Sequence, residues 1–144
     1  MSTTVRMMLE AKGRDVVTVE PEITLLEVAG ILNDRKIGAV VVAGMEGRIA
    51  GIFTERDLVR SIATNGVGVL DQPVQAMMTT NVQRCREEQT VDEVMGMMTS
   101  GRFRHVPVEA QSRLAGIISI GDVVKARMRE VEIEAEQMKA YIAG

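Results

Sequence analysis

Two short stretches carry the residues best suited to ligand chemistry, Gly-Ile-Phe-Thr-Glu-Arg-Asp at 51–57 and Gly-Ile-Ile-Ser-Ile-Gly-Asp at 116–122. In each, a hydroxyl residue stands three positions before an aspartate. An aspartate near a helix N-terminus can accept two hydrogen bonds from a vicinal diol, while the hydroxyl and the first amides of the helix favour an anion. A ribose phosphate offers both groups. Asp57 with Thr54, and Asp122 with Ser119, are therefore predicted to bind such a ligand.

Helix capping is the simpler explanation of the same residues. A Thr or Ser followed three positions later by an acid is a capping box, and the chain has four of them, beginning at Thr24, Thr54, Thr90 and Ser119. The second and fourth end in Asp, where the box prefers Glu or Gln. We expect the shorter acid to reach back to the cap less well and so to be freer for a ligand. We also expect the glycine before each motif to let a ligand approach the backbone closely.

The two motifs lie in an internal repeat. Gly51 and Gly116 are 65 residues apart, and Thr24 and Thr90 are 66 apart. Hydrophobic periodicity in each copy predicts strand, helix, strand, strand, helix. The predicted strands are 15–19, 37–43 and 48–53 in the first copy and 81–85, 105–110 and 113–118 in the second, and the helices are 24–36 and 90–102, with a last helix that begins near Glu55 and near Gly121.

Connection lengths then predict how these elements pair. A strand, crossover helix and strand give parallel neighbours, and the short turn that follows gives an antiparallel hairpin. One such small sheet is thin for an independent core, so the copies are expected to pack face to face about a pseudo-two-fold axis. The glycines and Pro73 mark 66–74 as the linker. The predicted division is 1–68 for the first repeat with its N-terminal segment, 69–127 for the second, and 128–144 for a C-terminal helical extension.

The doubled β-α-β-β-α unit, with Gly-apolar-x-Thr/Ser-x-x-Asp at each second helix, resembles a tandem cystathionine-β-synthase (CBS) domain pair, or Bateman module, from about Val5 to Arg127. The resemblance implies an α/β fold of the α+β type, in which two CBS repeats pack about a pseudo-two-fold axis and an extended C-terminal helix follows. It also implies a regulatory module that binds adenosine-containing ligands in the clefts between its repeats.

The resemblance further implies roles for particular residues. Asp57 and Asp122 would hold the ribose hydroxyls, Thr54 and Ser119 would lie near the ribose and phosphate, and Arg104 would bind phosphate. Gly38 occupies the position of Arg104 in the first copy, so the Asp122 site is better equipped for a charged nucleotide. Arg56 either replaces the missing arginine or is solvated. The adenine pocket is completed by the opposite repeat, which assigns Thr24, Ala29, Ile37 and Ala39 to the Asp122 site and Met95 and Phe103 to the Asp57 site.

Composition limits the remaining functions. The formal net charge of −3 argues against nucleic-acid or anionic-membrane binding, which needs a basic field. The chain has no apolar run of membrane-spanning length and no signal-peptide pattern, so we expect a cytoplasmic protein. Cys85 aligns with Val19 and is predicted to be a buried, inert thiol, and the single His105 is more typical of packing than of metal binding. No nucleophile with a base is evident, so we expect no enzyme and no metal.

The C-terminal stretch has a helical pattern of its own. Apolar residues are spaced 4, 3, 4, 3 and 4 apart, as at the a and d positions of a coiled coil: Val124, Met128, Val131, Ala135, Met138 and Ile142. This helix either folds back against Val5, Met8 and Leu9 or forms a homodimer contact, and both alternatives stay open.

The sequence thus predicts a non-enzymatic sensor of an adenine nucleotide, with AMP favoured and ADP or ATP behind it, that acts on an unknown effector protein. An NAD(H) or S-adenosylmethionine sensor is one alternative. A ligand-free dimeric interaction module, whose active surface is the C-terminal helix, is the other. No catalytic cofactor is expected in any of the three.

Overall fold

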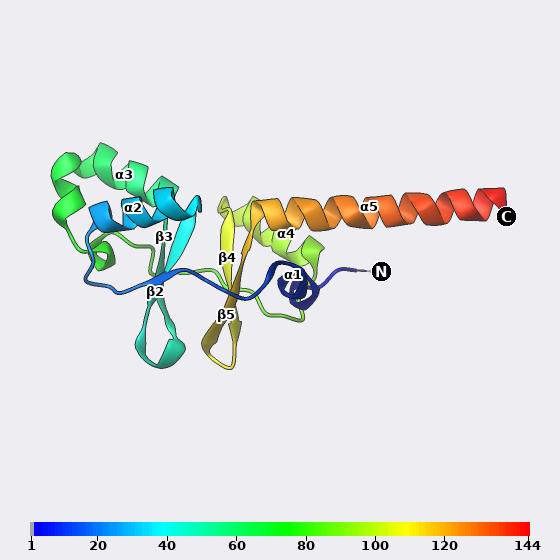
Figure 1. Cartoon of the computed structure of the whole chain (residues 1–144), viewed down its shortest axis with the longest axis horizontal. Helices are drawn as coiled ribbons and strands as arrows, with labels where there is room; N and C mark the ends of the chain where they lie inside the picture. Colours follow the sequence, from blue (N-terminus) through cyan, green and yellow to red (C-terminus); the bar gives the residue numbers. More distant parts are fainter. Residues whose placement is uncertain (1) are drawn as a thin grey trace. The chain divides into compact units, whose positions relative to one another are not determined.

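The computed structural model describes residues 2–144, which divide into two compact units (Figure 1). The Asp57 unit comprises residues 15–83 and 111–114, and the Asp122 unit comprises residues 2–14, 84–110 and 115–144. This division differs from the one expected from the sequence, because the N-terminal segment joins the second repeat and residues 69–83 stay with the first.

The Asp57 unit is a three-stranded sheet with two helices side by side against it (Figure 1). The strand order is β1-β2-β3, with β1 parallel to β2 and β2 antiparallel to β3, as the connection lengths predict. The elements are β1 (Thr18–Val19), α2 (Leu25–Arg35), β2 (Ala39–Ala43), β3 (Ile49–Thr54) and α3 (Glu55–Asn65). Their buried apolar side chains, including Leu25, Val28 and Phe53, form one core cluster.

The stretch predicted as a linker is a packed part of this unit. It forms two short 3-10 helices, η2 (Val67–Asp71) and η3 (Val74–Ala76), and buries Val69 and Val74 in the same core. The amide of Leu25 also donates to the carbonyl of Gln72 at 3.0 Å. The interpretation of 66–74 as a plain linker is therefore wrong, because its apolar residues cover the ends of α2 and α3.

The Asp122 unit contains α1 (Val5–Lys12), α4 (Val91–Gly101), β4 (His105–Ala110), the part of β5 (Arg113–Ser119) from residue 115 onward, and α5 (Ile120–Ala143). β4 and β5 are neighbours in a two-stranded sheet, and α4 lies beside α5 (Figure 1). Val5 and Leu9 of α1 are fully buried against Val94 and Val123. α1 therefore supplies part of the core of the second repeat.

The predicted strand 81–85 is not formed, and only Cys85 pairs, in a parallel bridge with Val108. In the first repeat the amide of Val41 donates to the carbonyl of Val17 at 3.1 Å and extends the ladder. The residue equivalent to Val41 is Pro107, which has no N–H to donate. The second repeat therefore loses the bond that would continue its first strand.

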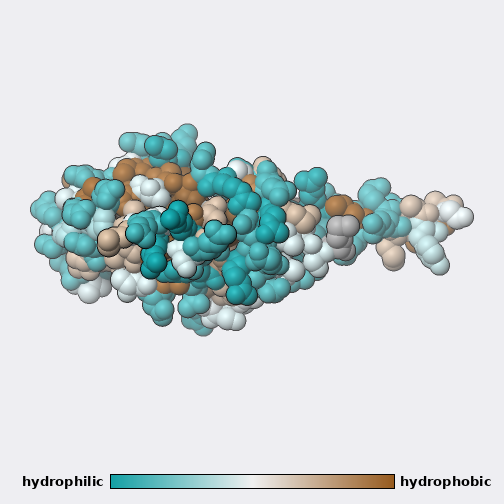
Figure 2. Space-filling view, turned by 90° about the horizontal axis from the view of Figure 1, so that it is seen from below, coloured by the Kyte–Doolittle hydropathy of each residue, from teal (hydrophilic) through white to brown (hydrophobic). Residues whose placement is uncertain are grey.

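α5 extends well past the rest of its own unit (Figure 1). Its first turns are packed, because Val123 is buried and Ala126 is half-buried against the α1 cluster. Every residue from Val131 onward is exposed, and hydrophilic and apolar side chains are both visible along the projecting end (Figure 2). None of the described helices has the length and hydropathy needed to cross a membrane.

Candidate ligand site

Both motif aspartates close a reciprocal capping box at the start of a helix. Thr54 Oγ1 accepts from the amide of Asp57 at 3.2 Å, and the amide of Thr54 donates to Asp57 Oδ2 at 3.0 Å. The same two bonds join Ser119 and Asp122, at 3.2 and 2.8 Å. Each aspartate is thus fixed by one of its two carboxylate oxygens.

The expectation that aspartate reaches back less well than glutamate is wrong. At α2 and α4 the caps Thr24 and Thr90 accept from the amides of Glu27 and Glu93, but neither glutamate returns the bond to the amide of its cap. The short aspartate side chain keeps Oδ2 against the first turn, where it also meets the cap hydroxyl, at 3.1 Å from Thr54 and 2.9 Å from Ser119. A ligand role must therefore rest on the second oxygen, Oδ1.

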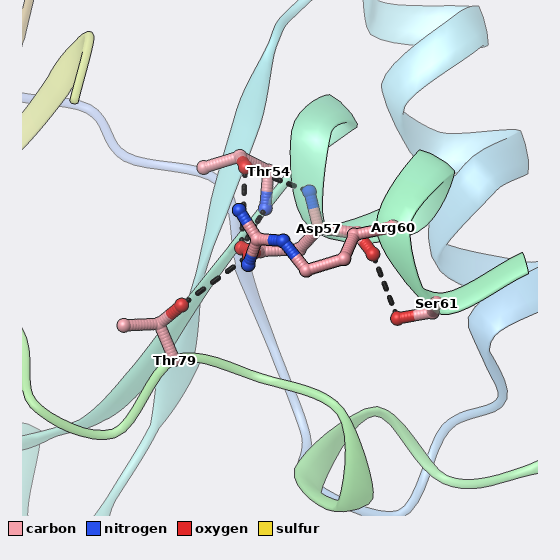
Figure 3. A network of polar contacts seen from close by, with 5 residues as sticks. All are labelled: Thr54, Asp57, Arg60, Ser61 and Thr79. Atoms are coloured by element: carbon pink, nitrogen blue, oxygen red, sulfur yellow. Dashed lines mark hydrogen bonds and ion pairs between the residues drawn. The ribbon is translucent and has the colours of Figure 1, made fainter. Parts of the chain in front are cut away.

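In the Asp57 unit this second oxygen is occupied (Figure 3). Arg60 Nη1 donates to Asp57 Oδ1 at 3.1 Å, and Thr79 Oγ1 donates to it at 3.3 Å. Ser61 Oγ donates to the Asp57 carbonyl at 2.7 Å, and the Asp57 side chain is only 7% exposed. All of the carboxylate of Asp57 is therefore engaged by its own unit.

In the Asp122 unit the arrangement differs. Lys12 Nζ donates to Asp122 Oδ2 at 2.7 Å and to the carbonyl of Ile117 at 3.0 Å, so three groups share Oδ2. Oδ1 accepts no hydrogen bond within residues 2–144, and the side chain is 21% exposed. Burial raises the pKa of Asp122, but the hydrogen bonds from Lys12 and Ser119 outweigh it and leave the pKa below its ordinary value. Asp122 is thus an ionised carboxylate with one open acceptor.

The glycine that opens each motif packs against protein, which differs from the expectation of a ligand there. A Cβ on Gly51 would lie 2.6 Å from Met78 Sδ and 2.8 Å from the carbonyl oxygen of Thr79. A Cβ on Gly116 would lie 2.6 Å from Leu9 Cδ2. The glycines therefore make room for two chain segments, 74–79 and 5–12, each within its own unit.

Arg104 lies next to the Asp122 motif through the backbone. The amide of Ile120, the first residue of α5, donates to the carbonyl of Arg104 at 2.8 Å, and Glu55 makes the equivalent bond to Gly38 at 3.0 Å. The alignment of Arg104 with Gly38 is thereby confirmed. The Arg104 side chain is exposed, and Arg56 is exposed in the first turn of α3, one position before Asp57.

The residues predicted for the adenine pockets lie in both units. Ala39 pairs with Thr54 across β2 and β3, and Thr24 caps α2. Ala29 and Ile37 are half-buried in the Asp57 unit, and Met95 and Phe103 are half-buried against the core of the Asp122 unit. Their assignment to the site of the opposite repeat stays a prediction.

Cys85 is completely buried, as its alignment with Val19 predicts. Burial raises the pKa of its thiol to about 12, which keeps it protonated and unreactive near neutral pH. His105 lies on β4 and is half-buried. Within residues 2–144, no three His, Cys, Asp or Glu side chains lie close enough together to hold a metal ion.

Three residues of this site were missed from the sequence: Lys12, Arg60 and Thr79. A signal for two of them was present, since Val5 and Met8 in one segment recur as Val74 and Met77 in the other, each pair 69 residues apart. The two segments that cover the motifs are therefore themselves a repeat. That similarity was overlooked because 66–74 was interpreted as a linker.

The family model for the CBS domain matches the chain twice, at residues 10–64 and 74–129. The chain belongs to the CBS domain family. Among solved structures, a CBS-domain containing protein from Agrobacterium tumefaciens is 58% identical, with a TM-score of 0.84 over 88% of this chain and 95% of that one. The mitochondrial CBS domain-containing protein CBSX3 of Arabidopsis thaliana is 32% identical over 99% of this chain and 73% of its own length.

A third CBS pair was solved with ligands. The CBS domain pair of protein MJ0100 was crystallised with 5′-methylthioadenosine and S-adenosyl-L-methionine, and it is 25% identical, with a TM-score of 0.79 over 90% of this chain and 99% of that one. The resemblance predicted from the doubled motif is thus confirmed, and the chain is a CBS pair, a regulatory type of module.

Proposed function

We propose that this CBS pair is a non-enzymatic sensor that binds an adenosine-containing ligand, with the ribose diol on Asp122. The observation that carries the proposal is the carboxylate of Asp122, which is fixed through Oδ2 and open at Oδ1. A fixed, ionised acceptor binds a hydroxyl more strongly than a neutral group does, because the hydrogen bond is charge-assisted. The adenosine ligands of the MJ0100 pair support this ligand class.

AMP is the first choice of ligand, with ADP and ATP behind it. Arg104 presents an exposed cation at the residue whose carbonyl binds the first amide of α5, and the N-terminus of α5 itself favours an anion. Both features favour a phosphate over the positive sulfonium of S-adenosylmethionine. NAD(H) remains the principal alternative, because it carries the same adenosine and phosphate groups.

A thermal-shift panel of AMP, ADP, ATP, NAD, NADH and S-adenosylmethionine tests the proposal, followed by calorimetry. A ligand at a hundred times its Kd adds about 2.7 kcal/mol to the free energy of unfolding. Asp122→Asn keeps the shape of the side chain but removes its charge, and should weaken binding by about tenfold to a hundredfold. Glu93→Gln is the matched control, since Glu93 has the same position in α4 but closes no capping box. Equal affinities of the Asp122→Asn variant and the unmutated chain would contradict the assignment.

A second candidate function, self-association, is favoured by the exposed side of α5. The apolar residues at a and d spacing are all exposed in the described chain: Val124, Met128, Val131, Ala135, Met138 and Ile142. The alternative in which these residues fold back on α1 is therefore contradicted, since it is Val123 that packs there. We propose that α5 pairs in parallel with α5 of a second copy, which makes the module a homodimer.

Charge supports the parallel orientation. In this register Arg127 and Glu134 occupy g positions, while Glu132 and Lys139 occupy e positions. In a parallel pair a g residue meets the e residue five positions later on the other helix. Arg127 would then face Glu132 of the second copy, and Glu134 would face its Lys139. Both pairs are attractive. A fully overlapping antiparallel pair would instead bring Glu132 close to the same residue of the second copy.

Sedimentation of two matched variants tests this surface. Val131 and Ile133 are both β-branched and both 51% exposed, but only Val131 lies at an a or d position. Val131→Lys should lower self-association, Ile133→Lys should leave it unchanged, and truncation after Arg129 should abolish it. Equal effects of the two lysine substitutions would contradict the pairing. The dimer would present a ligand-dependent surface to an effector protein.

A further inference from the structure

Lys12 joins the N-terminal segment to the Asp122 motif. It is the last residue of α1, which ends at Gly13 with a positive φ of 101°. Its ammonium group donates to Asp122 Oδ2 at 2.7 Å and to the carbonyl of Ile117 at 3.0 Å. Lys12 therefore contacts two residues of the Gly116–Asp122 motif from outside the repeat that carries the motif.

The donor and acceptor count leaves one open group on each partner. A lysine ammonium has three N–H donors, and two of them are used by Asp122 and Ile117. The third N–H of Lys12 and Oδ1 of Asp122 have no partner within residues 2–144. Both side chains are partly exposed, 32% for Lys12 and 21% for Asp122. A hydrogen-bond donor and a hydrogen-bond acceptor are thus held side by side and open to solvent.

This pair matches the chemistry of a sugar diol, because a hydroxyl both donates and accepts a hydrogen bond. We propose that Lys12 is a second ribose-binding residue of this site, which donates its third N–H to a ribose hydroxyl while Asp122 Oδ1 accepts from the diol. The inference rests on the proposed adenosine site and adds the residue that completes it.

Two other roles for Lys12 fit the geometry less well. A latch that the ligand must displace would occupy Oδ1, but Lys12 bonds to Oδ2 and leaves Oδ1 open. A purely structural ion pair between partly exposed side chains contributes little to stability. In the Asp57 unit the equivalent carboxylate is held by Thr79 and Arg60, and both of these bond to Oδ1. Only the Asp122 unit therefore keeps an open acceptor beside an open donor.

Calorimetry with two ligands tests the role of Lys12. The ligands are AMP and its dideoxy analogue, which lacks both ribose hydroxyls, and every variant carries Asp57→Asn so that the Asp122 site dominates binding. Lys12→Met keeps the length of the side chain but removes its donors, and should weaken AMP binding about tenfold while leaving the dideoxy analogue unchanged. Arg6→Met removes one charge from the same helix, where Arg6 pairs with Glu87 and Glu88, and should change neither affinity.

Each other outcome has a distinct meaning. Equal weakening of both ligands by Lys12→Met would place Lys12 at the phosphate and overturn the diol role. Tighter binding of AMP would make Lys12 a competing latch, and unchanged binding would make it structural; either result overturns the inference while the proposed function stands. If the Asp57→Asn chain with Lys12 intact binds neither ligand, the proposed function fails together with the inference. Lys12→Gln, which keeps a shorter neutral donor, replaces the methionine variant if that variant does not fold.

Discussion

Releasing the second oxygen of Asp57 should turn a closed carboxylate into a stronger ligand site. In the structure Asp57 Oδ1 accepts from Arg60 and Thr79, whereas Asp122 Oδ1 accepts from no described residue. A ribose hydroxyl can reach Asp57 only after at least one of those contacts is given up. The double variant Arg60→Met with Thr79→Val removes both donors and keeps the size of both side chains.

The cost of those contacts sets the size of the effect. Arg60 is 71% exposed, so its ion pair with Asp57 contributes about 0.2 to 1 kcal/mol. The hydroxyl of Thr79 donates across a long 3.3 Å, which we take as about 1 kcal/mol. Together the two contacts amount to about 1 to 2 kcal/mol, and removing them should tighten binding at Asp57 by roughly fivefold to thirtyfold.

Calorimetry with AMP in an Asp122→Asn background measures this site. Arg35→Met, an exposed substitution in the last turn of α2, is the control for loss of one positive charge. Thr79→Val leaves the two backbone bonds between Ile52 and Thr79 in place, so the covering segment should keep its position. If the double variant binds AMP no more tightly than the control, the closed carboxylate does not limit this site and the reasoning is refuted.

Three further outcomes are expected. Gly51→Ala should cost more stability in urea unfolding than Gly116→Ala, which should cost about 1 to 3 kcal/mol, because the new methyl group meets a backbone carbonyl in the first case and only a leucine side chain in the second; equal losses would contradict this. The Cys85 thiol should react with a thiol reagent at pH 8 only after unfolding, since burial raises its pKa to about 12; fast reaction of the native chain would contradict it. The lowered pKa of Asp122 stabilises the fold above the ordinary pKa of about 3.9, and this contribution is lost as pH falls through the folded value, so Lys12→Met should reduce the loss of stability on acidification; an unchanged pH profile would argue against the ion pair.

The helices could be predicted from the sequence because their signals are local. The helix predicted at 24–36 is observed as Leu25–Arg35, and the one predicted at 90–102 as Val91–Gly101, with Thr24 and Thr90 as their caps. A cap and a 3.6-residue period are read from neighbouring residues alone. The strand predicted at 81–85 failed because its pairing depends on Pro107, which lies more than twenty residues away.

The two motif aspartates were also predictable, but not the state of their carboxylates. The spacing of Thr54 and Asp57 indicated a cap or a ligand site, and the structure shows that the cap uses only Oδ2. Whether Oδ1 is open depends on residues that come from distant parts of the chain, such as Lys12 and Thr79. No local pattern reports that distinction, so the sequence could rank the two sites only through Arg104.

The unequal carboxylates follow from the segments that cover the two motifs. Ile52 and Ile117 are 65 residues apart and equivalent, yet the carbonyl of Ile52 accepts from the backbone amide of Thr79 at 2.9 Å, and that of Ile117 accepts from the side chain of Lys12 at 3.0 Å. Backbone pairing brings the hydroxyl of Thr79 onto Oδ1 of Asp57, whereas a long side chain reaches Oδ2 of Asp122 and leaves Oδ1 open. Since Thr79 lies in the chain between the two repeats and Lys12 lies before both of them, the connection between the copies is what distinguishes the sites. A repeat duplicated without change would still differ at these carboxylates, because only one copy can be preceded by the other.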